Sequence, residues 1–160
     1  MISVDVLREF RPIIRYPDGS SITLYAVQNA ITERAKEMGL PIAFYQDQVK
    51  SGGMFNKVIE DCIVMYHPAH PNDYFKFCIR VSHQGSYAFV NIMDFGSSKQ
   101  MSKAGQIAAY KEDRQGQSMS YKVGSLIGQA FASIGSNKAK LEEEQNYYSC
   151  ITDLLDEIIS

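Results

Sequence analysis

The sequence predicts an α+β protein with two layers: a four-stranded antiparallel meander sheet packed by an N-terminal helix and two C-terminal helices. Residues 74–95 alternate apolar and polar side chains through two strands that a glycine-containing turn connects. Apolar residues recur at helical spacing before this region and again after it. The length of 160 residues suits one domain, residues 1–160, with a single sizeable core.

The first predicted elements are a short hairpin and a helix. The Pro-Asp-Gly turn signal at residues 17–19 would join residues 13–16 to residues 22–25 as a hairpin. A helix is predicted over residues 24–38, where apolar side chains follow steps of three and four. Gly39 supplies a left-handed cap after it, and Pro41 prevents its continuation.

The sheet is predicted over about residues 42–95. Its four strands are separated by a loop with paired glycines, a proline-containing loop and a tight turn, and they cover residues 42–48, 58–66, 74–82 and 87–95. A symmetrical hairpin around His70 would place Cys62 opposite Cys78 and Glu60 opposite Arg80. The Glu60–Arg80 pair would be a favourable cross-strand charge contact.

The next hairpin is predicted to turn at residues 84–85, which places Ile79 opposite Val90. The strands then agree on one apolar face. Asp61 is the exception, because this register points its carboxylate into the core.

The C-terminal third of the sequence predicts helices. Residues 99–117 form a loop or a weak surface helix, and a helix is expected over residues 123–134. A stripe of small residues at Gly124, Gly128 and Ala132 would let that helix lie close to the sheet or to a second copy of the chain, as in a homodimer. Residues 136–137 would cap a last helix that runs to the C-terminus.

Composition narrows the function classes. A net charge of −2 gives no general attraction to nucleic acid or to acidic lipid, and no apolar stretch is long enough to span a membrane. Three cysteines at irregular spacing predict reduced thiols, which places the protein in the cytoplasm. Phosphate-binding and dinucleotide-binding glycine motifs are missing, so no cofactor is predicted.

One loop carries metal-ligand side chains. His67 and His70 are three residues apart, and Asp73 lies three residues further on. The two prolines of this loop equally predict a rigid hairpin connection, so these three residues are weak candidates and no metal is predicted.

Two surfaces are candidate binding sites. The polar face of the sheet combines aromatic and cationic side chains at Tyr74, Lys76, Arg80, Tyr87 and Phe89. The last helix carries Asp153, Asp156 and Glu157 near its C-terminus, where the helix dipole disfavours negative charge and a basic partner would compensate.

These surfaces predict a small non-enzymatic adaptor, regulator or inhibitor that binds another protein. The first alternative is an RNA-binding or single-stranded DNA-binding module that stacks bases on the same sheet face. The second is a small metal-dependent or acid/base enzyme that uses the histidine loop or a buried Asp61.

Overall fold

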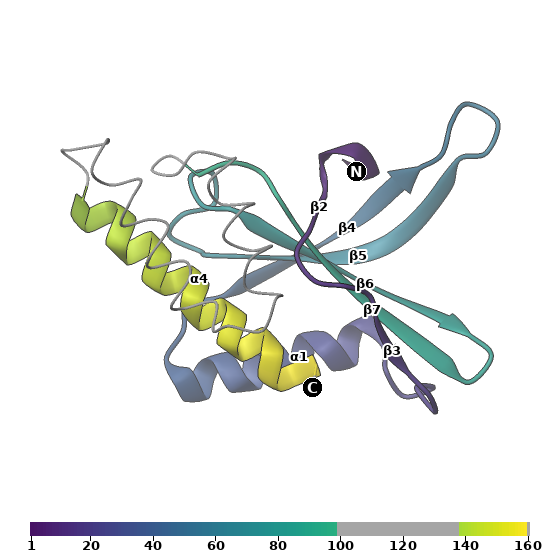
Figure 1. Cartoon of the computed structure of the whole chain (residues 1–160), viewed down its shortest axis with the longest axis horizontal. Coiled ribbons are helices and arrows are strands. Elements are labelled where there is room, and N and C mark those ends of the chain that lie inside the picture. Colours follow the sequence, from purple (N-terminus) through teal and green to yellow (C-terminus); the bar gives the residue numbers. More distant parts are fainter. Residues whose placement is uncertain (99–137, 160) are drawn as a thin grey trace. The chain divides into compact units, whose positions relative to one another are not determined.

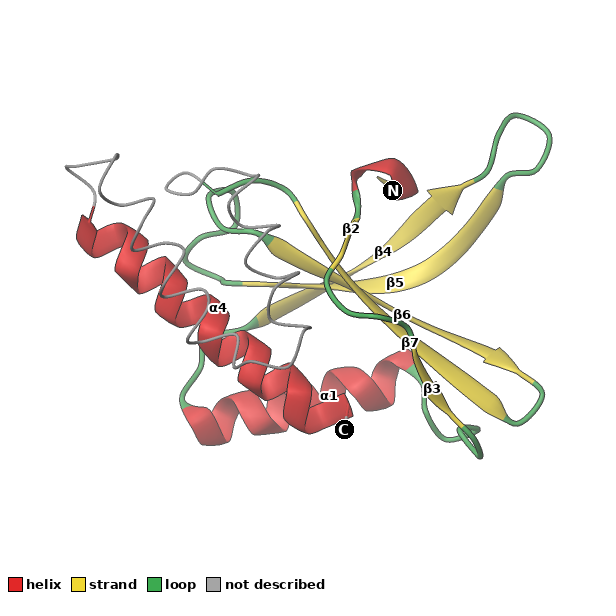
Figure 2. Cartoon of the chain, viewed as in Figure 1, coloured by secondary structure: helices red, strands yellow, loops and turns green. Residues whose placement is uncertain are grey.

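The computed structural model describes residues 1–98 and 138–159, which belong to two compact units (Figure 1). The first unit contains Met1–Pro71 and Phe75–Gly96, and the described residues of the second are Asn72–Tyr74, residues 97–98 and residues 138–159. The described residues form a curled mixed sheet and two α-helices (Figure 2). The predicted α+β class is therefore confirmed.

The four predicted strands are the centre of the sheet. They are β4 (Ala43–Ser51), β5 (Val58–Tyr66), β6 (Lys76–Gln84) and β7 (Tyr87–Phe95), and each pairs antiparallel with the next. Alternation of apolar and polar side chains is what makes these segments recognisable, because successive side chains of a strand point to opposite faces of the sheet.

The predicted number of strands is wrong, because the N-terminal segment adds three. These are β1 (Ile2–Ser3), β2 (Arg8–Glu9) and β3 (Ile14–Tyr16), with a 3₁₀ turn, η1 (Val4–Val6), between β1 and β2. Strand β1 pairs parallel with β4, while β2 and β3 both pair antiparallel with β7. The sheet order is β1-β4-β5-β6-β7-β2.

The predicted N-terminal hairpin is also wrong. Ile14 pairs with Val90 of β7, and Leu24 already belongs to helix α1. The turn at residues 17–19 instead brings Gly19 against β7, where its backbone N–H donates to the Ser86 carbonyl at 2.7 Å. A long strand edge offers more hydrogen-bonding groups than the short segment that follows the turn, so β3 pairs with β7.

Helix α1 (Leu24–Met38) has the predicted bounds. The Thr23 hydroxyl accepts a hydrogen bond from the Ala26 N–H at 3.0 Å, which caps the first turn. Gly39 ends the helix in the left-handed conformation with φ of 66°, as the sequence predicts. The helix buries Val27, Ile31 and Ala35, so its apolar stripe is the packed one.

Both predicted hairpin registers are displaced by two residues. Cys78 lies opposite Val64 rather than Cys62, and Ile79 lies opposite Ile92 rather than Val90. The second turn is centred on residues 85–86, where Gly85 supplies a φ of 59°. A shift of two residues preserves which face each side chain occupies, so the predicted apolar face is retained.

Residues 2–9, which comprise β1, η1 and β2, cross one face of the sheet. We call this segment the strap, and the face that it crosses the strap face. Five residue steps separate Ser3 on one outer edge from Arg8 on the other. Even fully extended, five steps reach at most about 18 Å. Five inter-strand spacings in a flat sheet would require about 24 Å. The sheet must therefore curl until its outer edges approach each other.

The curl gives the sheet a core on each face. Under the strap, the core consists of buried Ile2, Leu7, Val49, Cys62, Val64 and Cys78. On the other face, Phe10 of the N-terminal segment meets Phe77 of β6 edge to face, with ring centroids 5.2 Å apart. The predicted core position of Asp61 is wrong, because β5 bends outward there and leaves Asp61 exposed, with its Oδ1 accepting from Gln48 Nε2 at 3.1 Å.

The last described element is helix α4 (Lys138–Ile159), which corresponds to the predicted C-terminal helix. The predicted helix over residues 123–134 and its small-residue stripe lie outside the described residues.

A buried ion pair fixes the end of the strap. Arg8 Nε lies 2.6 Å from Asp94 Oδ1, and the Asp94 side chain is only 2% exposed. The Arg8 guanidinium also donates to the Gly96 carbonyl at 3.2 Å and stacks over the Phe75 ring, 4.9 Å from its centroid. Strand β2 has two residues, so this side-chain pair rather than its short ladder holds it on β7.

We expect Arg8→Met to lower the free energy of unfolding by about 3 kcal/mol, because it removes the guanidinium from a buried carboxylate. Urea denaturation followed by circular dichroism measures this loss, and adding Asp94→Leu to the variant should restore most of it. The control is Lys36→Met, which removes an exposed cation from α1 and should cost less than about 0.5 kcal/mol. Equal losses in the two single variants would contradict the anchoring role of Arg8.

Candidate functional site

The sheet opens between β5 and β6. These strands pair only where residues 63–65 of β5 face residues 77–79 of β6. Beyond that point the β4–β5 and β6–β7 hairpins point apart (Figure 1), and within the described chain no strand covers the facing edges of residues 58–61 and 80–84. We call this opening the split.

The strap explains the split. It joins β4 at Val49 to β7 at Asp94, which lie diagonally across the four-stranded meander. Because the strap is too short for a flat sheet, the β4–β5 hairpin bends over the strap face. The β6–β7 hairpin instead stays with β3, so β5 and β6 separate.

A hollow of about 470 Å³ lies in the split on the strap face. We call it the Arg80 hollow, and its lining includes Ile13, Glu60, Arg80, Ser82, Phe89 and Asn91. Alternation along β6 and β7 points Arg80, Ser82, Phe89 and Asn91 to this same face. The hollow thus combines one guanidinium, one aromatic ring and several neutral polar groups.

Arg80 is the most constrained charge of the hollow. Its side chain is only 15% exposed, and Nη1 lies 3.2 Å from Glu60 Oε2 across the split. Nη2 contacts the Met93 sulfur at 3.3 Å. The buried Nε has no hydrogen-bond partner among the described residues. A guanidinium has five N–H donors, so the two Nη atoms keep hydrogen-bonding capacity toward a ligand beyond their contacts with Glu60 and Met93, whereas the buried Nε is out of a ligand's reach.

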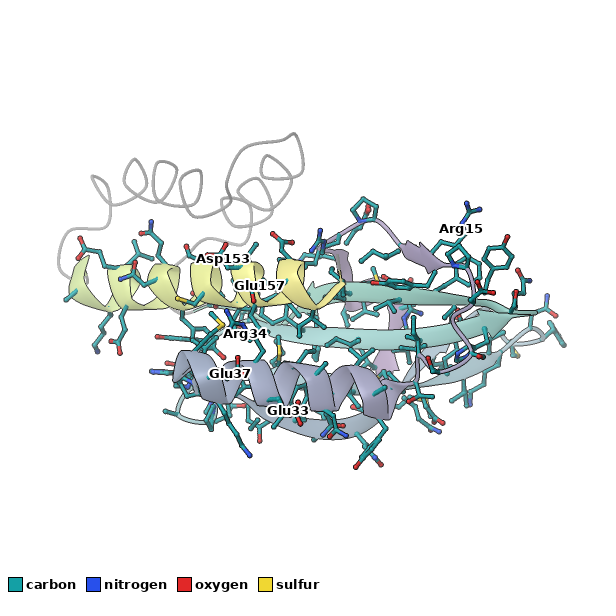
Figure 3. The ribbon with its side chains drawn as sticks, turned by 90° about the horizontal axis from the view of Figure 1, so that it is seen from below. Arg15, Glu33, Arg34, Glu37, Asp153 and Glu157 are labelled. Carbon is teal, nitrogen blue, oxygen red and sulfur yellow. The ribbon has the colours of Figure 1, made fainter. Side chains whose placement is uncertain are left out.

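The predicted sheet face is divided by the curl. Lys76 lies over two tyrosine rings, with Nζ 5.6 Å from the Tyr45 centroid and 6.0 Å from the Tyr66 centroid. At the other end of the face, Arg15 of β3 projects outward (Figure 3) and lies 5.6 Å from the Tyr87 ring. Phe89 lies with Arg80 in the hollow, so the structure brings these two predicted residues together and not Lys76 or Tyr87.

Tyr74 belongs to the second unit rather than to this face. It precedes β6, is only 4% exposed, and its ring centroid lies 5.6 Å from that of Tyr147 and 5.8 Å from that of Tyr148. Burial, and then the charges of Glu144 and Glu143, raise the pKa of Tyr74 to about 12. Its role in the structure is packing within that unit.

The acidic residues of α4 lie on exposed positions. Asp153, Asp156 and Glu157 are all exposed, and Figure 3 labels Asp153 and Glu157 on the helix. Partial desolvation, and then the charges of Asp156 and Glu157, raise the pKa of Asp153. The three carboxylates therefore repel one another on one part of the helix surface.

The histidine loop is ordered by its own backbone contacts. His67 Nδ1 accepts from the Ala69 N–H at 3.0 Å, and the His70 N–H donates to the His67 carbonyl at 3.0 Å. The two rings meet edge to face with centroids 4.7 Å apart. Asp73 belongs to the second unit. Among the described residues, no three histidine, cysteine, aspartate or glutamate side chains form a group that would hold a metal ion.

The thiols of Cys62 and Cys78 are buried under the strap at 1% and 0% exposure. A hydrogen bond that the Cys78 thiol donates to Cys62, and then burial, raise the pKa of Cys78, while the same bond lowers the pKa of Cys62. A protonated and inaccessible thiol contributes packing rather than reactivity.

Sequence reasoning missed several residues of the Arg80 hollow. Ser82 and Asn91 follow from strand alternation once the face of Arg80 is known. Ile13 carries no such signal, because its place depends on the pairing of β3 with β7, more than 70 positions away in sequence. The Glu60–Arg80 contact was predicted and is present as an ion pair, although the two residues are not in the predicted direct register.

Comparison of the chain with protein-family models, with curated proteins and with solved structures gives no match. None of the helices that the structure describes is long and apolar enough to cross a membrane. The argument for function therefore depends on the site itself.

The raised pKa of Tyr74 predicts a loss of stability at high pH. The unfolded chain releases the Tyr74 proton near pH 10 and the folded chain near pH 12, so the stabilisation is complete below pH 10 and is lost between these values. Urea denaturation at a series of pH values should show the free energy of unfolding falling less steeply for Tyr74→Phe than for the unsubstituted chain. Tyr25→Phe, a change in a 73% exposed ring, is the matched control. Superimposable profiles for Tyr74→Phe and the unsubstituted chain would contradict this assignment.

Proposed function

We propose that the protein acts as an adaptor, regulator or inhibitor by binding another protein at the Arg80 hollow. The observation that carries the proposal is Arg80 itself. Its side chain is only 15% exposed, Nη1 pairs with Glu60, and the two Nη atoms keep N–H donors beyond their contacts with Glu60 and Met93 at an open hollow. Such a guanidinium is already ordered, so binding requires little further loss of side-chain freedom.

The residue types around Arg80 also support protein binding. Arginine and aromatic residues carry a large share of the binding energy in protein interfaces, especially near the centre of the contact. Phe89 supplies the aromatic surface here, while Ser82 and Asn91 supply hydroxyl and amide groups for hydrogen bonds. The ion pair with Glu60 partly neutralises Arg80, which favours a partner with polar or singly charged groups over the regular phosphates of a nucleic acid.

The acidic residues of α4 are a second surface for the same function. Repulsion among Asp153, Asp156 and Glu157 falls when a cation approaches them, and this repulsion adds to partial desolvation in raising the pKa of Asp153. A basic protein surface would supply such cations. The proposal therefore includes two separate contact surfaces, of which the Arg80 hollow is the first to test.

The test is affinity capture from native host extract with the full chain as bait, in nuclease-treated and untreated halves. We expect one stoichiometric protein in both halves, and we expect Arg80→Met to reduce its recovery at least tenfold. Loss of the recovered protein after nuclease treatment would favour the nucleic-acid alternative. Recovery of no protein in either half would contradict the proposed function.

Lys36→Met is the matched control, because it removes a cation from an exposed position of α1 instead of from the hollow. A circular dichroism melt of each variant separates loss of binding from loss of folding. Phe89→Ala gives a second change in the hollow that leaves the Glu60–Arg80 pair intact. Retention of the partner by both Arg80→Met and Phe89→Ala would rule out the hollow as the contact site.

A further inference from the structure

Residues 80–84 of β6 form one of the two strand edges that face the split, the other being residues 58–61 of β5. Away from the split, the N-terminal segment pairs with part of each outer strand of the meander, since β1 lies on β4 at residues 49–50 while β2 and β3 lie on β7. Residues 80–84 of β6 pair with β7 on one side and with no described strand on the other. Open edges are usually blunted by proline, by lysine or by a covering segment, because unpaired backbone groups recruit another strand.

This edge has a hollow on each side of it. The Arg80 hollow lies on the strap face, and a second hollow of about 360 Å³ lies on the opposite face. We call the second one the Val81 hollow. Glu60, Ser82 and His83 line both, which places the two hollows on either side of the same split. An extended chain beside β6 would therefore find room for side chains on both of its faces.

We propose that β6 residues 80–84 bind an extended segment of the partner protein as an added antiparallel or parallel strand. This inference rests on the proposed protein-binding function and names how the partner is held. Main-chain hydrogen bonds to the open edge supply affinity, and the two hollows select side chains at alternate positions. The partner segment has about five residues in contact, since five residues of β6 are uncovered.

The lining of the hollows specifies the alternation in that segment. Side chains that enter the Arg80 hollow meet the Nη donors of Arg80 and the Asn91 amide, so they carry an oxygen acceptor such as a carboxylate or an amide. Side chains that enter the Val81 hollow meet Val81 and Leu24 together with the carboxylates of Glu60 and Asp61, so they combine an apolar stem with a positive charge, as lysine and arginine do. The partner segment therefore alternates acceptor-bearing residues with lysine or arginine.

The recessed position of the edge favours a single extended segment over a second copy of the sheet. Glu60 and Asp61 of β5 form the facing wall of the split, so the β4–β5 hairpin flanks the β6 edge. A complete sheet edge would have to enter between the two hairpins, whereas a single strand is thin enough to do so. Edge-to-edge pairing of two copies is thus the disfavoured occupant.

The test uses a phage-displayed library of linear twelve-residue peptides selected on the full chain. Selected peptides should share a core of about five residues with the predicted alternation. In a synthetic peptide of that sequence, N-methylation of every second core amide should weaken binding about tenfold or more at each position, because only those amides face β6. N-methylation of the intervening amides is the matched control and should change binding less than threefold.

A second readout locates the peptide on the protein. Amide hydrogen exchange should slow at alternate residues within 80–84 when the peptide is added, while residues 77–79 are already paired and should not change. Equal sensitivity of all core amides to N-methylation, or no slowing at 80–84, would overturn strand addition. Failure to select any peptide, or concentration-dependent dimerisation that protects 80–84 without peptide, would overturn it as well. In each of these cases, a partner protein whose capture depends on Arg80 would still support the proposed function.

Discussion

The short connection between β1 and β2 is the constraint on which the rest of the structure depends. It attaches one end of the N-terminal segment to β4 and the other to β7, although these strands lie at opposite sides of the central meander. Because the connection is shorter than the width of a flat sheet, the strands must curl. The buried Arg8–Asp94 pair holds β2 on β7 and so maintains this constraint, since two-residue strands alone form few hydrogen bonds.

The curl has opposite effects on the two ends of the meander. Under the strap it encloses Cys62, Val64 and Cys78 as a second small core, which removes much of the predicted open face. At the far end it separates β5 from β6 and leaves backbone edges and two hollows between the hairpins. The candidate binding site is thus a consequence of the same geometry that builds the second core. Arg80 lies between these regions, packed against Met93 and facing the hollow.

The sequence predicts the individual helices and strands of this fold but few of the contacts between segments that are distant along the chain. Period-2 alternation located β5 and β7 to the residue, and α1 has the predicted bounds and the predicted Gly39 cap. The hairpin registers were displaced by two residues, because alternation specifies the face of a side chain but not its partner. The strap, the pairing of β3 with β7 and the split depend on contacts between distant segments, which no local pattern encodes. For that reason Arg80 was predicted as a site residue, while Ile13 and the uncovered edge beside Arg80 were not.

The most direct test is residue-resolved amide hydrogen exchange of the free chain. It shows whether β5 and β6 are separated in the sheet that the strap curls. Amides in residues 63–65 and 77–79 should all be protected, because both edges of these segments are paired. In residues 58–61 and 80–84 every second amide should exchange rapidly, since only one edge of each strand is covered. Protection of consecutive amides through both of these segments would show that β5 and β6 remain paired along their length. That result would contradict the strap-induced split and the binding site that depends on it.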